Sequence, residues 1–340
     1  MLSNRRVLLV GVGKCVGALG VLTGLLAVSI AAKADTLKVC AVVTNKCFYT
    51  SVQQAVDVAR SGDTISIGPG VFVGSVFVGL LKDLTLEGQG STRTVLRGDF
   101  PFPPVPPRND VDAINCNGGG NIHIRGVTIT HTHGVDGPGI DNLDCTITVE
   151  KSTIQSNFAE SNGGGISNSG AMTVKNSDVQ DNLGEEGGGI YNTATLTIKD
   201  SHILNNEAYL DFHKLGGGGI YNSGTLTLQN SDVTGNDAFR GGGITNDRGT
   251  VFLKTSTIHK NHVHSSVSGG VVLLGEGGGI WNSGSVVLTS SLIDTNSAER
   301  QGGGIFNQSP GTIVETGGDT LFYMNVPNDC ADINGTVSCP

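Results

Sequence analysis

The hexapeptide Gly187-Gly188-Gly189-Ile190-Tyr191-Asn192 has several near-copies in this chain of 340 residues. Further copies of the Gly-Gly-Gly-Ile-x-Asn pattern surround Ile166, Ile220, Ile244, Ile280 and Ile305, and a degenerate copy surrounds Ile140. From Ile140 to Ile305 these isoleucines are 26, 24, 30, 24, 36 and 25 residues apart. A repeat of this length is typical of a solenoid.

Two more patterns lie between the copies. One is Ile or Val followed by x-x-Asn, as in Ile203 to Asn206, and the other is a short alternating segment such as 195–198. Alternation of apolar and polar residues indicates strands, and three short strands per repeat predict an all-β chain that forms a single parallel β-helix of about ten coils. We expect the repeated asparagines to stack at the bends and bond to backbone, and the glycines to permit tight bends and close backbone approach.

The N-terminal residues read as an export signal. Arg5 and Arg6 precede a long apolar run, and Ala32-Lys33-Ala34 is a small-x-small cleavage site, so we predict a signal peptide at residues 1–34 and a secreted or cell-surface protein. The alternative is a retained membrane anchor, because the segment 15–32 is long enough to span a bilayer.

Charge limits the partners of the exported chain. Removing residues 1–34 removes four of the 21 basic residues and none of the 30 acidic ones, which leaves a net charge of −13. This acidity argues against nucleic acid and anionic membranes as partners. It also disfavours a strongly anionic polysaccharide, unless Ca²⁺ or local basic groups mediate. We assign no certain cofactor, and we expect a monomer.

Six cysteines remain after signal removal, and an even number in an exported chain indicates disulfides. We favour the pairs Cys40–Cys47 and Cys330–Cys339, because each closes a short loop near one end. Cys116 and Cys145 are about one coil apart and could bridge neighbouring coils. A metal site is the rival interpretation, but the spacing does not support one.

The ends of the chain differ from the repeats. In the segment 51–60, apolar residues at helical spacing follow a Ser51-x-x-Gln54 capping box and precede Gly62, which predicts one short amphipathic helix. We assign residues 35–62 to an N-terminal cap over the open end of the β-helix, residues 63–316 to the β-helix and residues 317–340 to a C-terminal cap. Five prolines within 101–107 predict an extended loop.

This N-terminal region resembles the opening of the pectate-lyase-like right-handed β-helix superfamily. The resemblance covers roughly residues 48–99 and rests on the helix, Gly62-Asp63-Thr64-Ile65, 68–72 and 84–90. The repeats in 137–309 are similar to those of polymorphic outer-membrane proteins, with Gly in place of Ala and Ile or Val in place of Phe. Both resemblances imply the fold and its right-handedness. Neither transfers a catalytic residue.

Two long repeats suggest where chemistry could lie. Ile190 to Ile220 and Ile244 to Ile280 carry extra residues at equivalent corners, so they should leave from one edge and form a groove. The acid, base and cation candidates gathered at this rim are Asp211, His213, Lys214, Asp237, Arg240, His262, His264 and Glu276. A uronate lyase needs a base and a cation for the substrate carboxylate, and the acids are candidate Ca²⁺ ligands. The alternative is that these are ordinary solvated loop residues, and for His262 and His264 we predict no metal site.

A second candidate surface comes from the residue between Ile and Asn of each repeat, which should face away from the interior. This position carries aromatic residues in four of the seven copies. They are Tyr191, Tyr221, Trp281 and Phe306. Exposed aromatic rows bind sugar faces or proteins, whereas buried ones stabilise the sheet.

Three functions therefore remain open. The leading hypothesis is a protein that binds glycan or another surface partner through the aromatic row and the loop rim. The alternative is a polysaccharide lyase or glycoside hydrolase acting in the groove; hydrolysis would require two carboxylates at a defined separation. The third is a passive structural solenoid.

Overall fold

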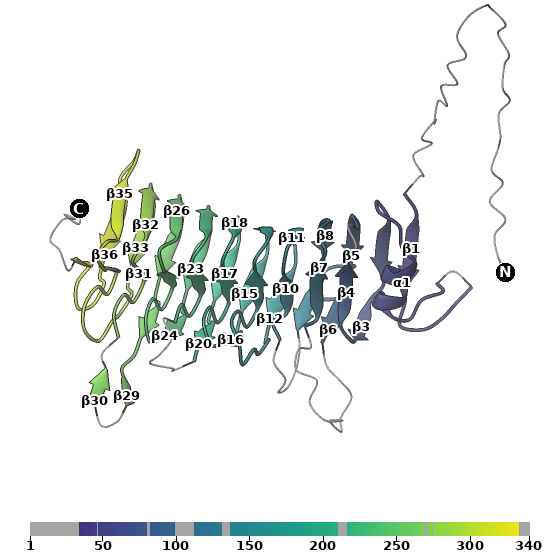
Figure 1. Ribbon diagram of the computed structural model, residues 1–340, viewed down its shortest axis with the longest axis horizontal. Helices are drawn as coiled ribbons and strands as arrows, with labels where there is room; N and C mark the ends of the chain where they lie inside the picture. Colours follow the sequence, from purple (N-terminus) through teal and green to yellow (C-terminus); the bar gives the residue numbers. More distant parts are fainter. Residues whose placement is uncertain are drawn as a thin grey trace, which may run out of the picture. The chain divides into compact units, whose positions relative to one another are not determined.

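The computed structural model describes residues 34–45, 47–79, 82–98, 112–130, 137–209, 216–268, 271–273 and 275–332 (Figure 1). The chain divides into two units, residues 1–33 and residues 34–340, and the description concerns the second. The predicted signal peptide, apart from Ala34, and the proline-rich segment 101–107 lie outside the described residues. None of the described helices is long and apolar enough to cross a bilayer.

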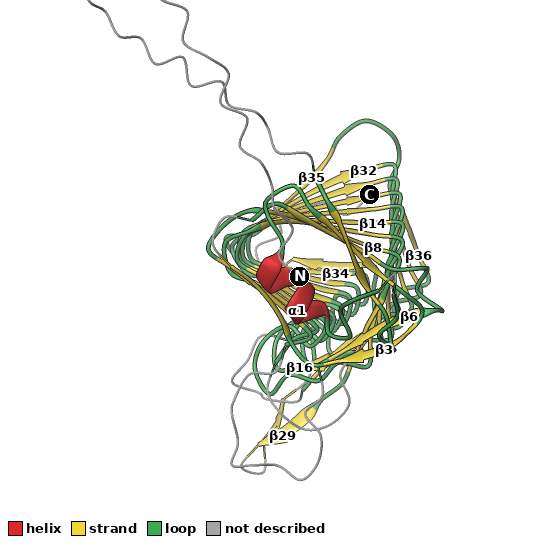
Figure 2. Ribbon diagram, turned by 90° about the vertical axis from the view of Figure 1, so that its right-hand side faces the viewer, coloured by secondary structure: helices red, strands yellow, loops and turns green. Residues whose placement is uncertain are grey.

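The described residues between 34 and 332 form a stack of β coils, as predicted (Figures 1 and 2). Three long parallel sheets run along the stack, and each coil contributes one strand to each sheet in the order sheet 2, sheet 1, sheet 3. Every pairing within these sheets is parallel and joins strands of adjacent coils. The repeat predicted about ten coils, and the ten or eleven strands of each long sheet confirm this number.

Sheet 1 has eleven described strands: β1 (Thr36–Val39), β2 (Thr64–Ile67), β5 (Leu84–Glu87), β8 (Asn121–Arg125), β11 (Thr146–Glu150), β14 (Ala171–Lys175), β18 (Thr195–Lys199), β22 (Thr225–Gln229), β26 (Thr250–Lys254), β32 (Ser285–Thr289) and β35 (Thr312–Glu315). Sheet 2 has ten: β4 (Val76–Gly79), β7 (Ile114–Asn117), β10 (Ile140–Asn142), β13 (Ile166–Asn168), β17 (Ile190–Asn192), β21 (Ile220–Asn222), β25 (Ile244–Asn246), β31 (Ile280–Asn282), β34 (Ile305–Asn307) and β37 (Cys330–Asp332). Sheet 3 also has ten: β3 (Gly70–Val73), β6 (Thr94–Arg97), β9 (Thr128–Thr130), β12 (Thr153–Gln155), β15 (Asp178–Gln180), β19 (His202–Leu204), β23 (Asp232–Thr234), β27 (Thr257–His259), β33 (Leu292–Asp294) and β36 (Leu321–Tyr323).

Two smaller sheets complete the described strands. Sheet 4 consists of β16 (Leu183–Gly184), β20 (Glu207–Ala208), β24 (Asp237–Ala238) and β28 (His262–Val263), all parallel. Within the long repeat before Ile280, β29 (Ser266–Ser268) and β30 (Val271–Leu273) form an antiparallel hairpin. Figure 1 shows this hairpin projecting on the same side of the stack as sheet 4.

The interior is a set of aliphatic ladders. Strand side chains alternate in direction, so every second residue points inward, and the in-register pairing places equivalent residues of successive coils above one another. Ile190, for example, lies between Ile166 and Ile220, and all three are fully buried. Leu196 and Ile203 of the same coil are equally buried and complete its inward face.

Two asparagine ladders close the corners, as the repeated Asn predicted. In the first, the side-chain amide of each Asn donates to the side-chain carbonyl of the Asn one coil on, over 2.7–2.8 Å. In the second, which begins at Asn157 and ends at Asn325, the same contacts measure 2.9–3.0 Å. A third ladder, of serines from Ser152 to Ser291, was not anticipated: each hydroxyl accepts from the backbone N–H of the equivalent serine in the preceding coil.

The glycine triplet allows the backbone of adjacent coils to approach closely. The first glycine of a triplet, such as Gly187 with φ of 66°, adopts the left-handed region. A Cβ on Gly165, the last of its triplet, would lie 2.6 Å from the carbonyl oxygen of Gly189. A side chain at either position would therefore strain the bend or separate the coils.

The predicted helix is present as α1 (Val52–Val58), and its apolar face packs into the core through Val52, Ala55 and Val56. It contacts β1, β2 and β4, and Figure 2 shows it in front of the space that the sheets enclose. The expected capping box was wrong in detail, because Ser51 is the N-cap residue but its side chain makes no capping hydrogen bond.

Strand pairing extends past both predicted domain boundaries. β1 lies inside the segment assigned to the N-terminal cap, yet it pairs in register with β2. β36 and β37 lie after residue 316, yet they pair with β33 and β34. These strands lack the Gly-Gly-Gly-Ile-x-Asn pattern.

Disulfides occur where the sequence suggested them. Cys40 bonds to Cys47 across seven residues, and Cys116 bonds to Cys145 across 29. The second bond joins neighbouring coils, because Cys116 lies in β7 and pairs with Asn142 of β10. Cys330 is disulfide-bonded, and Cys339 lies outside the described residues.

The asparagine ladder makes a direct prediction about stability. Asn236 is fully buried, donates to Asn261 and to the Ile203 carbonyl, and accepts from Asn206. Replacing it by Ala leaves these partners unsatisfied, at about 1–3 kcal/mol for each orphaned group. We expect Asn236→Ala to lower the urea midpoint of unfolding clearly, while Gln229→Ala on the exposed end of β22 leaves it nearly unchanged. Equal midpoints for the two variants would contradict this account of the ladder.

Candidate functional site

Sheet 4 forms an extra edge that the sequence analysis did not foresee. Its strands directly follow the second asparagine ladder, and each places one residue inward and one outward. Ala208, Ala238 and Val263 point inward and are fully buried. The outward residues pair in register from Glu207 to Asp237 and from Asp237 to His262. A small or apolar residue two positions after each ladder Asn is the signal that could have revealed these strands.

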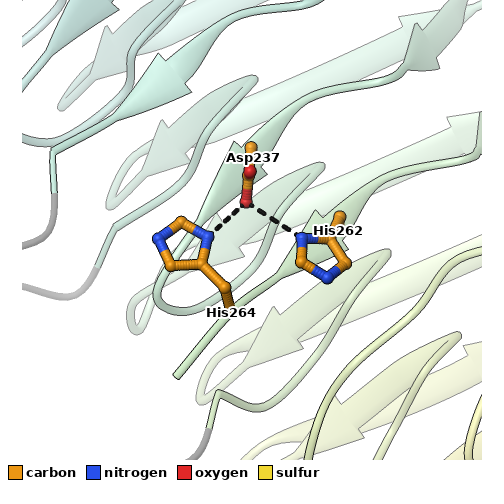
Figure 3. A group of neighbouring side chains, drawn as sticks. All are labelled: Asp237, His262 and His264. Carbon is orange, nitrogen blue, oxygen red and sulfur yellow. Dashed lines mark hydrogen bonds and ion pairs between the residues drawn. The ribbon is translucent and has the colours of Figure 1, made fainter. Parts of the chain in front are cut away.

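Three side chains on this edge meet at one point, and we call Asp237, His262 and His264 the rim cluster (Figure 3). One Asp237 carboxylate oxygen lies 2.7 Å from Nδ1 of His264 and 3.3 Å from Nδ1 of His262. The two imidazole rings are nearly parallel, with centroids 6.0 Å apart. The side chains of Asp237 and His262 are 40% and 47% exposed, so the cluster is open to solvent.

The strand geometry explains why the cluster forms. His262 and His264 are two positions apart and extend on the same side of the chain, while Val263 between them is buried. Asp237 is the register partner of His262 on the neighbouring strand. The backbone N–H of His264 also donates to the carbonyl of Ala238, which continues the pairing beyond β28.

Acidic neighbours raise the pKa of His264. The hydrogen bond to Asp237 is the main cause that raises the pKa of His264 above its usual value, and the charges of Asp237, Glu207 and Glu299 act in the same direction. Partial burial of the ring opposes them. The electrostatic potential at the rim cluster is therefore negative, which favours cationic groups there.

The other predicted rim residues have different surroundings. The backbones of Arg240 and Glu276 form a parallel β-bridge between adjacent coils. The Arg240 guanidinium carbon lies 5.6 Å from the centroid of the Phe239 ring and 5.7 Å from that of the Trp281 ring. Glu276 is 6% exposed and accepts a 2.6 Å hydrogen bond from Arg300. Its roles as catalytic acid or Ca²⁺ ligand remain predictions. Asp211, His213 and Lys214 lie outside the described residues, as does part of the predicted groove.

His259, next to the rim cluster in sequence, belongs to sheet 3 and bonds Asp294 at 3.0 Å. His259 is therefore separate from His262 and His264, although it precedes His262 by only three residues. A shallow depression of about 360 Å³ lies elsewhere, over β5, β8 and β11, and is lined by Asp83, Asn121 and His123 among others. Hydrogen bonds from Asn121 lower the pKa of the exposed Asp83 carboxylate.

The predicted exposure of the aromatic row was wrong. Tyr221, Trp281 and Phe306 are 6%, 3% and 1% exposed, and Tyr191 is partly buried against Tyr221 with ring centroids 4.9 Å apart. Tyr221, Trp281 and Phe306 lie outside the interior cluster of buried residues, but they are not open to solvent. The Arg240 guanidinium lies over the Trp281 ring of the next coil, and the Thr245 hydroxyl donates to the Arg240 carbonyl.

Tyr221 illustrates the consequence of this cover. Burial, the charges of Asp247 and Glu186, and a 3.1 Å hydrogen bond to Asp247 together raise the pKa of the Tyr221 hydroxyl. The aromatic row is therefore a second, outer layer of packing, which is the role that buried ladders play in sheets.

Comparison of sequences identifies the family. A family model described as "Right handed beta helix region" matches residues 112–315, more than half of the chain. The chain belongs to this right-handed β-helix family. No curated protein sequence matches it closely enough to be reported.

Solved structures share the fold at low sequence identity. A pectate lyase, Pel9A, superposes with a TM-score of 0.50 at 13% identity, covering 89% of this chain and 81% of that one. A pectin methylesterase from carrot gives 0.43 at 14% identity, covering 87% and 88%. An alginate lyase from Paenibacillus sp. str. FPU-7 gives 0.40 at 14%, covering 86% and 97%. At these identities the likeness concerns the right-handed parallel β-helix alone.

The burial of the sole tryptophan can be tested by fluorescence. Because Trp281 is only 3% exposed, we expect blue-shifted emission that acrylamide quenches weakly in the folded chain and strongly in urea. Trp281→Ala removes a buried aromatic side chain and should cost about 3–5 kcal/mol of stability. Ready quenching in the folded protein would contradict the burial.

Proposed function

We propose that this right-handed β-helix is a secreted protein that binds an extended glycan along sheet 4, with the rim cluster as the main contact. The observation that carries the proposal is the outward row Glu207, Asp237 and His262, in register on adjacent strands. Adjacent strands are about 4.8 Å apart, a step comparable to one sugar unit of an extended chain. Polar groups repeated at that step can bond successive hydroxyls.

The surroundings favour a neutral or cation-bridged glycan. Asp237 and the flanking Glu207 and Glu299 make the edge acidic, and these carboxylates accept hydrogen bonds from sugar hydroxyls. An anionic chain would be repelled unless a cation lies between. The buried aromatic row is not part of the proposed contact surface.

Glycan binding is tested with immobilised neutral and uronate-containing polysaccharides, each with and without Ca²⁺. We expect His264→Ala and Asp237→Asn to bind about tenfold more weakly, because each loses a hydrogen bond involving a charged group, worth about 1.5–3 kcal/mol. His202→Ala is the matched control: His202 also bonds an aspartate, Asp178, but lies on sheet 3. Retention that is equal for all variants, or absent throughout the panel, would contradict the proposal and favour the passive structural solenoid.

A second candidate, a polysaccharide lyase or hydrolase, is supported by the Asp237–His264 hydrogen bond. Asp237 holds Nδ1 of the imidazole, so Nε2 is left for proton transfer, which is the orienting arrangement used by histidine bases. Arg240, the predicted partner for a substrate carboxylate, stacks on aromatic rings instead of reaching openly into solvent.

The enzymatic alternative is tested by incubating the chain with the same panel while following unsaturated uronate absorbance and new reducing ends together. Turnover that His264→Ala reduces by about 10²-fold or more, with His202→Ala unaffected, would establish a role for the pair. New reducing ends without absorbance would indicate hydrolysis and direct attention to Asp237 and Glu276. Absence of both signals would count against an enzyme of this class.

A further inference from the structure

The rim cluster has the donor set of a transition-metal site. Asp237, His262 and His264 each offer one ligand atom, and these three atoms lie within 4.8 Å of one another. Two imidazoles and one carboxylate are the ligands that proteins supply to zinc and similar divalent ions. A Ca²⁺ ion, by contrast, requires six to eight oxygen ligands, which this set does not provide.

The backbone beneath these three ligands is fixed by buried neighbours, whereas the ligand side chains are partly exposed. Val263 between the two histidines is fully buried, and Ala238 next to Asp237 is buried as well, so the backbone beneath the cluster is held by the core. The side chains themselves are 22–47% exposed and can rotate. Ligand atoms around a tetrahedral ion with bonds of 2.0–2.1 Å are about 3.4 Å apart. Because the ligand atoms lie within 4.8 Å of one another, side-chain rotation that shortens each separation by at most about 1.4 Å would close the site.

The two present contacts are compatible with this closure. Asp237 already lies 2.7 Å from His264 and 3.3 Å from His262, so the carboxylate is close to both imidazoles. An ion held by all three would take the place of the shared hydrogen bonds. The acidic neighbours Glu207 and Glu299 add negative potential, which favours a cation over an anion at this point.

We propose that Asp237, His262 and His264 bind one Zn²⁺ ion, or a similar divalent transition metal, with at least one coordination position open to solvent. Three protein ligands on an exposed edge leave the fourth position for water or for an oxygen atom of a bound molecule. The metal site rests on the geometry of the rim cluster alone. Where the proposed glycan binding also holds, the open position would receive a sugar hydroxyl or carboxylate.

His202 is also close to aspartates, but its surroundings lack the second histidine of the rim cluster. His202 lies between Asp178 and Asp232 on successive coils, with nitrogen-to-oxygen distances of 2.9 and 3.6 Å. It supplies one imidazole between two carboxylates placed on opposite sides along the stack, without a second histidine two positions on. His202 is therefore a matched control, about as exposed as His262 and likewise close to an aspartate.

The test is a calorimetric titration of the untagged full chain with Zn²⁺ in the absence of glycan, repeated with Co²⁺ while the visible spectrum is recorded. We expect one ion per chain and an intense Co²⁺ absorption typical of four-coordinate nitrogen and oxygen ligation. His262→Ala, His264→Ala and Asp237→Asn should each weaken binding by more than about tenfold, whereas His202→Ala should not. Circular dichroism confirms that each variant remains folded, and any one folded variant suffices for the comparison.

Two results would overturn the metal site: no saturable binding below millimolar Zn²⁺, or binding that is the same in every rim-cluster variant as in the wild type. The glycan proposal is judged separately, by retention on polysaccharide in the presence of Zn²⁺, and a parallel run with a chelator shows whether the ion mediates the contact. Zinc binding without glycan retention would leave the metal site standing and reject the glycan proposal. Retention on glycan without zinc binding would reject the metal site and leave the glycan proposal standing.

Discussion

In-register pairing between one coil and the next is the constraint on which this molecule depends. Parallel strands that pair without a register shift place equivalent residues above one another. Each side chain therefore lies next to the equivalent side chain of the next coil, about 4.8 Å away. Isoleucine then meets isoleucine in the dry interior, and asparagine meets asparagine at the corners. A buried amide satisfies part of its donor and acceptor capacity because the next coil presents another amide at the same height, and backbone carbonyls accept from it as well.

The same constraint creates the functional edge. The strands of sheet 4 leave the second asparagine ladder in register, because the ladder sets their starting height in every coil. The regular pairing of the backbone consequently brings side by side those residues that differ between repeats. Asp237 comes from one repeat and His262 from the next, and their adjacency follows from the pairing. The solenoid thus keeps its corners invariant and varies the outward positions.

Outward direction and exposure are separate properties in this fold, as the aromatic row demonstrates. Strand alternation correctly placed Trp281 and Phe306 on the side away from the interior. Their burial depends on contacts from neighbouring coils, such as that of Arg240 with Trp281, and no local pattern encodes these contacts. Conversely, His264 follows the last residue of β28 and would read as a loop residue, but pairing with Ala238 brings it against Asp237.

The sequence by itself determined the coils, their approximate number, the interior ladders and the capping helix, and it favoured the disulfide between Cys40 and Cys47. Each of these depends on a repeat or on a spacing that is visible along the chain. Tertiary structure alone decided which outward residues meet solvent and which meet each other. The sequence placed Asp237, His262 and His264 along one rim, but their direct contact requires a fourth sheet whose two-residue strands are too short to have a period of their own. Contacts across coils arise from pairing, and pairing is a property of the stack.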